Sequence, residues 1–179
     1  QAAHEALARP SSTVRHFKMS LGSRDVLCKD PQGKAYTATD CAALFLAQLK
    51  QDAEAALGDT VTAAVISVPA NYDDRQKHET LEAARKAGLD VSKLVHEPTA
   101  AATAYGLKKG QDQTFLVTDL GGGTYDASLV RCQGDEVHVL GTDGIADLGG
   151  RKYTEAIKEY ALAEFTKATR HKPNPKKDI

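Results

Sequence analysis

Residues 115–132 read FLVTDLGGGTYDASLVRC, and this stretch decides how the chain is interpreted. Asp119 stands at the end of an apolar run, three glycines follow, and a second run leaves through Thr124 and Asp126. Such a pattern predicts two β-strands joined by a tight glycine turn. Because glycine has no Cβ atom, the backbone of this turn can approach a bulky anion closely.

The turn has the chemistry of a phosphate site. Successive N–H groups of Gly121, Gly122 and Gly123 can converge on phosphate oxygens, and the Thr124 hydroxyl can add a donor. Carboxylates on both sides suit Mg²⁺, a hard cation that keeps several waters. The alternative is a tight hairpin with solvated acids, but the acids, the threonine and the preceding strand together favour phosphate binding. The glycines open a strand rather than a helix and no GK[ST] follows, which argues against dinucleotide and Walker loops.

A second signal lies in residues 97–106, EPTAAATAYG. Glu97 follows a short strand and directly precedes a helix of small residues. One interpretation is an ordinary acid at a helix N-terminus, where it complements the helix dipole. The other is a ligand-facing carboxylate on a helix that packs closely against its neighbours.

The spacing of apolar residues, and the glycines and prolines that end helices and strands, predict the remaining elements. The expected helices are Ala2–Leu7, one from a Thr37–Asp40 capping box to Gly58, one from Asp73 or Asp74 to Ala87, Pro98–Tyr105, and one striped from Tyr153 to Ala168 and ended by Pro173 and Pro175. The expected strands are Val26–Cys28, Ala35–Thr37, a buried Val61–Val68, Leu94–His96, Phe115–Leu120, Thr124–Cys132 and Val137–Gly141. This order indicates an α/β to α+β chain with a break near 108–113.

Composition narrows the class of protein. The chain has 179 residues, 41% hydrophobic and 26% charged, with a formal net charge of −1, which predicts a soluble globular protein without affinity for nucleic acid or membrane. Cys28, Cys41 and Cys132 form no CxxC pair, which argues against zinc and a disulfide framework and favours a reduced cytoplasmic protein. The first residues have no signal-peptide pattern. Because the sequence starts at Gln1 and ends in a charged segment, we expect a fragment of a longer protein.

Four motifs follow one another along the chain: VISVPANYDDRQ at 65–76, LEAARKAGLDVSKLVHEPTAAATAYGL at 81–107, LVTDLGGGTYD at 116–126 and DLGG at 147–150. Together they resemble the nucleotide-binding domain of DnaK-type seventy-kilodalton heat-shock chaperones, over about residues 13–153. The resemblance implies an α/β, actin-like (ribonuclease-H-like) ATPase domain. Its implied parts are a compact outer lobe I at 1–58, the lobe I core at 59–109, the lobe II core with the phosphate hairpin at 110–150, and the start of outer lobe II at 151–179.

The resemblance also implies a role for each residue that matches a family motif. Lys18 would be the catalytic lysine near the γ-phosphate and the attacking water. Glu97 and Asp119 would hold Mg²⁺ through water, with Asp126 as a second acid near the cation, and Thr124 would contact the γ-phosphate or the water. The remaining implied roles are phosphate binding by Gly121, Gly122 and Gly123, ribose or phosphate contact by Gly149 and Gly150, and an allosteric switch at Pro69 and Lys77.

As cofactors the resemblance implies ATP or ADP with Mg²⁺, and K⁺ as a further candidate. Its implied partners are unfolded polypeptides, bound through a separate substrate domain, a J-domain co-chaperone and a nucleotide-exchange factor. The chain departs from the family in several places. It lacks the opening DLGTT-like hairpin and the later adenine-clasping helix, has Arg151-Lys152 where two acids are usual, and has Lys77 where arginine is usual.

Two alternatives stay open at the level of sequence. Bacterial actin-like filament proteins of the MreB or FtsA type share a GGGT hairpin, an EP-containing helix and a VP turn. A relative that acts as an exchange factor or holdase and hydrolyses ATP poorly is compatible with Arg151-Lys152. The setting of Lys18, Thr99 with Tyr105-Gly106, and the LGG before Arg151 favour the chaperone ATPase.

Overall fold

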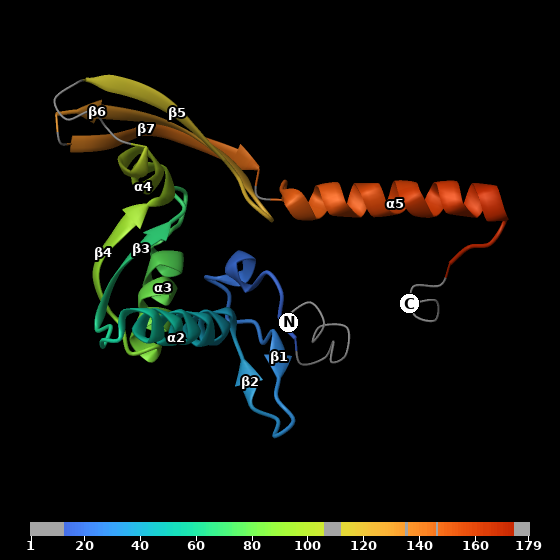
Figure 1. Cartoon of the computed structure of the whole chain (residues 1–179), viewed down its shortest axis with the longest axis horizontal. Coiled ribbons are helices and arrows are strands. Elements are labelled where there is room, and N and C mark those ends of the chain that lie inside the picture. Colours follow the sequence, from blue (N-terminus) through green and yellow to red (C-terminus); the bar gives the residue numbers. More distant parts are fainter. Residues whose placement is uncertain (1–12, 106–111, 135, 146, 174–179) are drawn as a thin grey trace. The chain divides into compact units, whose positions relative to one another are not determined.

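The computed structural model describes residues 13–105, 112–134, 136–145 and 147–173 (Figure 1). The chain divides into two compact units, Gln1–Lys109 and Gly110–Ile179. The expected helix at Ala2–Leu7 lies outside the described residues, and the four-part division of the chain stays a prediction. Among the helices described, none combines the length and the apolar character needed to cross a membrane.

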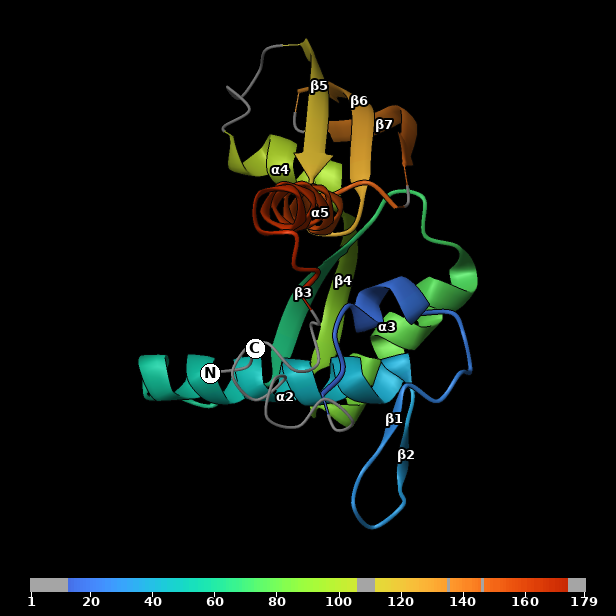
Figure 2. The same cartoon turned by 90° about the vertical axis from the view of Figure 1, so that its right-hand side faces the viewer.

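The first unit opens with a short 3-10 helix and a hairpin. The 3-10 helix η2 spans Phe17–Ser20. Strands β1 (Cys28–Lys29) and β2 (Ala35–Tyr36) pair antiparallel, as the turn signal predicts, although both are shorter than expected. Figure 2 shows this hairpin beside the first turn of the next helix.

Two helices of the first unit begin with capping boxes that the sequence encodes locally. Helix α2 spans Ala38–Leu57, and the side chains of Thr37 and Asp40 each accept from the other's backbone N–H. Helix α3 spans Asp74–Lys86 and begins with the same exchange between Asp73 and Gln76. These reciprocal hydrogen bonds satisfy N–H groups that the first helical turn leaves free.

The core of the first unit lies between α2 and α3. Ala42, Ala43 and Ala83 are buried there, and Phe17, Leu21 and Leu46 pack against them. Small side chains on both helices let the two backbones approach closely, and Phe17 of η2 packs against the buried alanines. The segment that carries Lys18 is therefore fixed to the α2–α3 pair through its neighbour Phe17.

Strands β3 (Ala63–Val68) and β4 (Asp90–His96) are parallel, and α3 connects them (Figure 1). Helix α4, Glu97–Ala104, follows β4 without a loop, so Glu97 is placed by the end of a strand. The prediction of a buried β3 is wrong for the described structure: Val68 is buried, but Val65 is 61% exposed. An apolar strand is buried only where other elements cover both faces, and among the described residues β3 has β4 as its one strand neighbour.

The second unit is a three-stranded antiparallel meander followed by one helix (Figure 1). Strands β5 (Gln113–Leu120), β6 (Tyr125–Gln133) and β7 (Glu136–Ile145) pair in sequence order, as predicted. Helix α5 spans Gly150–Thr169, so it starts three residues earlier than its apolar stripe predicts. It ends at Arg170 in a left-handed conformation (φ 56°), before the prolines that were expected to stop it.

Candidate functional site

In the first unit the structure brings together two predicted site residues that are 79 positions apart in sequence. The Nζ atom of Lys18, in η2, lies 2.8 Å from Oε1 of Glu97, the first residue of α4. The side chains are 56% and 23% exposed respectively. An ion pair this open to water contributes about 0–1 kcal/mol, so Lys18 can exchange Glu97 for another anion at little cost.

Tyr72 is a member of this group that the sequence interpretation missed. Its Oη donates a hydrogen bond to the backbone oxygen of Lys18 at 3.5 Å, and its own N–H donates to the oxygen of Pro69 at 3.2 Å. Burial, and secondly the charge of Glu97, raise the pKa of Tyr72 to about 12. The phenol therefore keeps its proton at neutral pH and remains a donor. The sequence did contain a signal for Tyr72: it is a polar aromatic residue three positions after Pro69, the proline that directly follows β3.

The two predicted switch residues occupy different positions in this unit. Pro69 directly follows β3, and Tyr72 bridges it to the Lys18 backbone. Lys77 lies on α3, with its Nζ 4.0 Å from Oδ1 of Asp74. Within the described residues, neither Pro69 nor Lys77 forms a direct hydrogen bond or ion pair with Lys18 or Glu97.

In the second unit the acids on either side of the glycine turn face each other. Asp119 of β5 and Asp126 of β6 are direct cross-strand partners, so their side chains share one face of the sheet. Gly144 of β7 is opposite Asp126, and a Cβ atom there would lie 2.6 Å from Asp126 Oδ1. The missing side chain at Gly144 leaves the space that the Asp126 carboxylate occupies. Gly144 is thus a second site residue that sequence reasoning missed, since a lone glycine in a strand gave only a weak signal.

Opposed carboxylates repel unless a cation lies near them, because like charges directly across a ladder are destabilising. No set of three or more Cys, His, Asp and Glu side chains suitable for a metal occurs in the described ranges. A cation here would therefore take its other ligands from water or from a bound anion. Mg²⁺ binds in that manner, through one or two carboxylates together with waters and phosphates.

The glycine turn is closed by a hydrogen bond within it and borders open space at its tip. The N–H of Gly121 donates to the oxygen of Thr124 at 3.0 Å. A Cβ atom on Gly122 would meet nothing within 4 Å, so the backbone at the tip of the turn borders open space. Thr124, which follows the turn, is half-buried. The tip could accept an oxyanion without displacing any described side chain.

Gly149 and Gly150 pack against this turn rather than standing apart from it. A Cβ atom on Gly149 would lie 2.6 Å from the nitrogen of Gly123 and 2.7 Å from the oxygen of Gly121. The N–H of Gly150 donates to the Gly121 oxygen at 2.9 Å, and the N–H of Arg151 donates to the Gly122 oxygen at 2.9 Å. The predicted contact of Gly149 and Gly150 with ribose or phosphate stays a prediction, and it would have to use atoms other than the Gly150 N–H.

The two basic residues that depart from the family pattern are paired with acids close to the start of α5. Arg151 contacts Asp147 and lies 3.2 Å from Glu155, and Lys152 lies 2.9 Å from Asp147. The hydrogen bond from Lys152 chiefly holds the pKa of Asp147 below its usual value. Positive charge is unfavourable at a helix N-terminus, and Asp147 offsets it.

Taken together, the second unit has a glycine turn with open space at Gly122, a neighbouring threonine and two opposed carboxylates. This donor set fits a phosphate group bound with Mg²⁺. The first unit, taken by itself, groups one exchangeable lysine, one carboxylate and one protonated phenol. A family model described as Hsp70 protein matches residues 6–178 of the chain, which covers both groups.

Proposed function

The chain belongs to the Hsp70 protein family, and from that premise we propose that it is the ATP-binding and ATP-hydrolysing part of a chaperone. Proteins of this family are nucleotide-binding chaperones and in general ATPases. The match favours a chaperone over an actin-like filament protein, which is the other class that shares the GGGT hairpin. In our proposal, hydrolysis drives the binding and release of unfolded polypeptides.

The observation that carries this proposal is the cross-strand pairing of Asp119 with Asp126 beside an open glycine tip. The strand register puts two negative charges on one face where they repel each other. We propose that Mg²⁺, bound through water, relieves this repulsion, and that the backbone at Gly122 receives a phosphate oxygen of ATP. When bound, Mg²⁺ supplies charge neutralisation for the phosphates.

Lys18 and Glu97 have complementary roles in the proposed reaction. Phosphoryl transfer needs little covalent chemistry from the protein, so positioning and electrostatic stabilisation dominate. We propose that Lys18 leaves its exposed pair with Glu97 and offsets the charge that develops on the γ-phosphate oxygens. Glu97 then accepts hydrogen bonds from the attacking water. Tyr72, whose phenol keeps its proton at neutral pH, stays a donor beside them.

Coupling to other proteins is a further part of the proposal. Unfolded polypeptides would bind to a separate substrate domain, with a J-domain co-chaperone and a nucleotide-exchange factor as regulators. Pro69 and Lys77 would link the nucleotide state to that domain. The hydrogen bond between Pro69 and Tyr72, and that between Tyr72 and the Lys18 backbone, supply a physical connection from Pro69 to Lys18.

The decisive experiment measures ATP binding and turnover in the full-length protein. We expect Lys18→Ala to abolish turnover and leave ATP affinity largely intact, because Lys18 acts mainly on charge formed during the reaction. Thr124→Val should slow hydrolysis or the ATP-driven conformational change. Gly122→Ala should weaken ATP binding without changing the unfolding transition, because its methyl group would enter space that is open in the protein alone.

Each outcome decides between specific alternatives. Unchanged kcat in Lys18→Ala removes Lys18 from the mechanism. Full ATP affinity in Gly122→Ala removes the glycine tip from the phosphate site. A wild-type protein that binds a partner chaperone but shows no turnover with ATP and Mg²⁺ would overturn the ATPase proposal in favour of an exchange-factor relative.

A further inference from the structure

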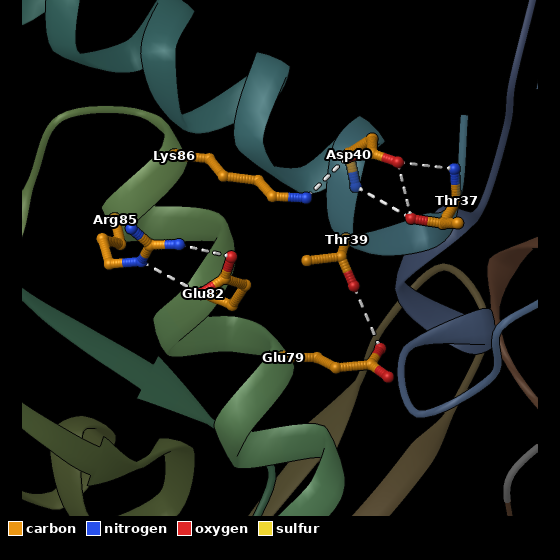
Figure 3. A network of polar contacts seen from close by, with 7 residues as sticks. All are labelled: Thr37, Thr39, Asp40, Glu79, Glu82, Arg85 and Lys86. Atoms are coloured by element: carbon orange, nitrogen blue, oxygen red, sulfur yellow. Dashed lines mark hydrogen bonds and ion pairs between the residues drawn. The ribbon is translucent and has the colours of Figure 1, made fainter. Parts of the chain in front are cut away.

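The carboxylate of Glu79, on α3, connects three segments of the first unit. Its Oε2 accepts a hydrogen bond from the N–H of Gly22 at 2.7 Å and one from Oγ1 of Thr39 at 3.1 Å. Arg75 Nε lies 3.5 Å from its Oε1. Only 16% of the Glu79 side chain is exposed. Figure 3 shows Glu79 directed from α3 toward Thr39 in the first turn of α2.

Gly22 belongs to the turn that closes the Lys18 segment. The N–H of Leu21 donates to the oxygen of Lys18 at 3.3 Å, and Gly22 follows in a left-handed conformation (φ +91°). Helix α3 holds this turn a second time, since Gln76 Nε2 donates to the Leu21 oxygen at 3.4 Å. A Cβ atom on Gly22 would lie 3.0 Å from Gln76 Cγ, so the turn is pressed against the helix.

The Lys18 side chain needs such support because little else holds it. It is 56% exposed, and its one ion pair in the described structure is with Glu97. The residue before the short helix, His16, forms no capping hydrogen bond with its side chain. Phe17 anchors the front of the segment by packing on the core and on Phe45. The back of the segment is anchored through Gly22 and Leu21.

We propose that Glu79 is a positioning residue for Lys18, which sets the direction of its ammonium group by fixing the turn at Leu21–Gly22 against α3. This role rests on the proposed ATPase function of Lys18. The hydrogen bond from the Gly22 N–H to Oε2 is 2.7 Å long and joins the turn directly to α3. The position of Glu79 on α3 and the length of its side chain bring Oε2 to that contact.

Three substitutions of Glu79 separate the effect of side-chain length, its reach, from the effect of charge. We expect the three variants to differ in the rate of steady-state ATP hydrolysis by the full-length protein. Glu79→Gln keeps the length and an acceptor oxygen, so kcat should stay near the wild-type value. Glu79→Asp keeps the charge but is one methylene too short, and Glu79→Ala loses both. For these two we expect kcat to fall about 10- to 100-fold with little change in the KM for ATP, since small misplacements of a catalytic group have effects of that size.

Two matched controls test whether general damage explains such losses. Thr39→Val removes the other hydrogen bond to the same Glu79 oxygen without touching the turn. Glu82→Gln removes a partly exposed acid on the same helix, where it is paired with Arg85 (Figure 3). Both should keep the wild-type kcat. Amide hydrogen exchange of the 17–22 segment should accelerate in Glu79→Ala and Glu79→Asp but not in the controls.

The outcomes separate this inference from the proposed function. If Lys18→Ala is inactive while Glu79→Asp and Glu79→Ala keep full kcat, the positioning role is wrong and the ATPase proposal stands. An active Asp variant together with an inactive Gln variant would also overturn it, because charge rather than reach would then matter. A wild-type protein without turnover ends both proposals. If Glu79→Ala does not fold, the comparison of kcat between Glu79→Gln and Glu79→Asp still decides whether Glu79 positions Lys18.

Discussion

Gly149→Ala is a substitution for which the structure predicts a large effect from a single methyl group. Gly149 is buried against the glycine turn, and its backbone is extended (φ −176°), so alanine is compatible with the backbone conformation itself. The obstacle is steric. The new Cβ atom would lie 2.6 Å from the nitrogen of Gly123 and 2.7 Å from both the oxygen of Gly121 and the carbonyl carbon of Gly122.

These neighbours are all backbone atoms, which cannot rotate away as a flexible side chain would. Ordinary contact requires about 3.5 Å or more, so the start of α5 must move outward by about 1 Å. That movement strains the hydrogen bonds from the Gly150 and Arg151 N–H groups to the turn, each 2.9 Å long. Overpacking costs about 1–3 kcal/mol and each lost hydrogen bond about 1 kcal/mol, so we expect destabilisation of about 2–4 kcal/mol.

Urea unfolding followed by circular dichroism measures this loss, and Gly150→Ala is the matched control. The nearest atoms to a Cβ on Gly150 are 3.9 Å away, and Gly150 is the first residue of α5, where alanine is a better helix former than glycine. Gly150→Ala should therefore be neutral or slightly stabilising. Equal unfolding midpoints for the two variants would refute the reasoning, because they would show that Gly149 does not press against the turn in solution.

Two further predictions concern the first unit and the cysteines. The hydrogen bond from Lys86 chiefly, together with those from Thr37, lowers the pKa of Asp40 from 3.8 to about 2 (Figure 3). The stability that the ionised Asp40 carboxylate contributes is therefore fully present above pH 3.8 and is lost as the pH falls through about 2. Lys86→Met should cost about 1 kcal/mol or less at pH 7, since the pair is partly exposed, and much less at pH 2, where the pH has reached the pKa of Asp40. Unfolding at both pH values measures this, and an equal cost at both would contradict it. Burial, and then the nearby Cys28 and Asp40, raise the pKa of Cys41, so iodoacetamide at pH 8 should alkylate Cys41 more slowly than a free thiol. Cys132, which is 1% exposed, should react only on unfolding; mass spectrometry of the alkylated peptides checks both, and rapid labelling of native Cys132 would show that β6 opens readily.

Features that depend on neighbours in sequence were predictable. The capping box of Thr37 with Asp40, the helix stop at Gly58 (φ 68°) and the order of three strands in the meander all arise from contacts or conformations within a few residues. The pairing of Asp119 with Asp126 also follows from a hairpin whose register its own turn fixes. For this reason the phosphate motif and its acids were visible in the sequence.

Other features depend on what each segment meets in space. Apolar residues in β3 predicted burial, but burial requires covering elements, and Val65 is 61% exposed in the described structure. In the same way, the apolar stripe of α5 correctly predicted a helix, yet α5 has no buried residue. Pattern alone identifies which side of an element is apolar and not what covers it.

From the sequence alone came the family resemblance, the element types and the residues with the chemistry for phosphate and Mg²⁺. Only the tertiary structure showed that Lys18 contacts Glu97, that Glu79 on α3 holds the Gly22 turn, and that Gly149 packs on the glycine turn. The physical reason is separation along the chain: capping and turn formation act over three or four residues, whereas these three contacts join segments 26 or more residues apart, whose encounter depends on how the whole unit packs.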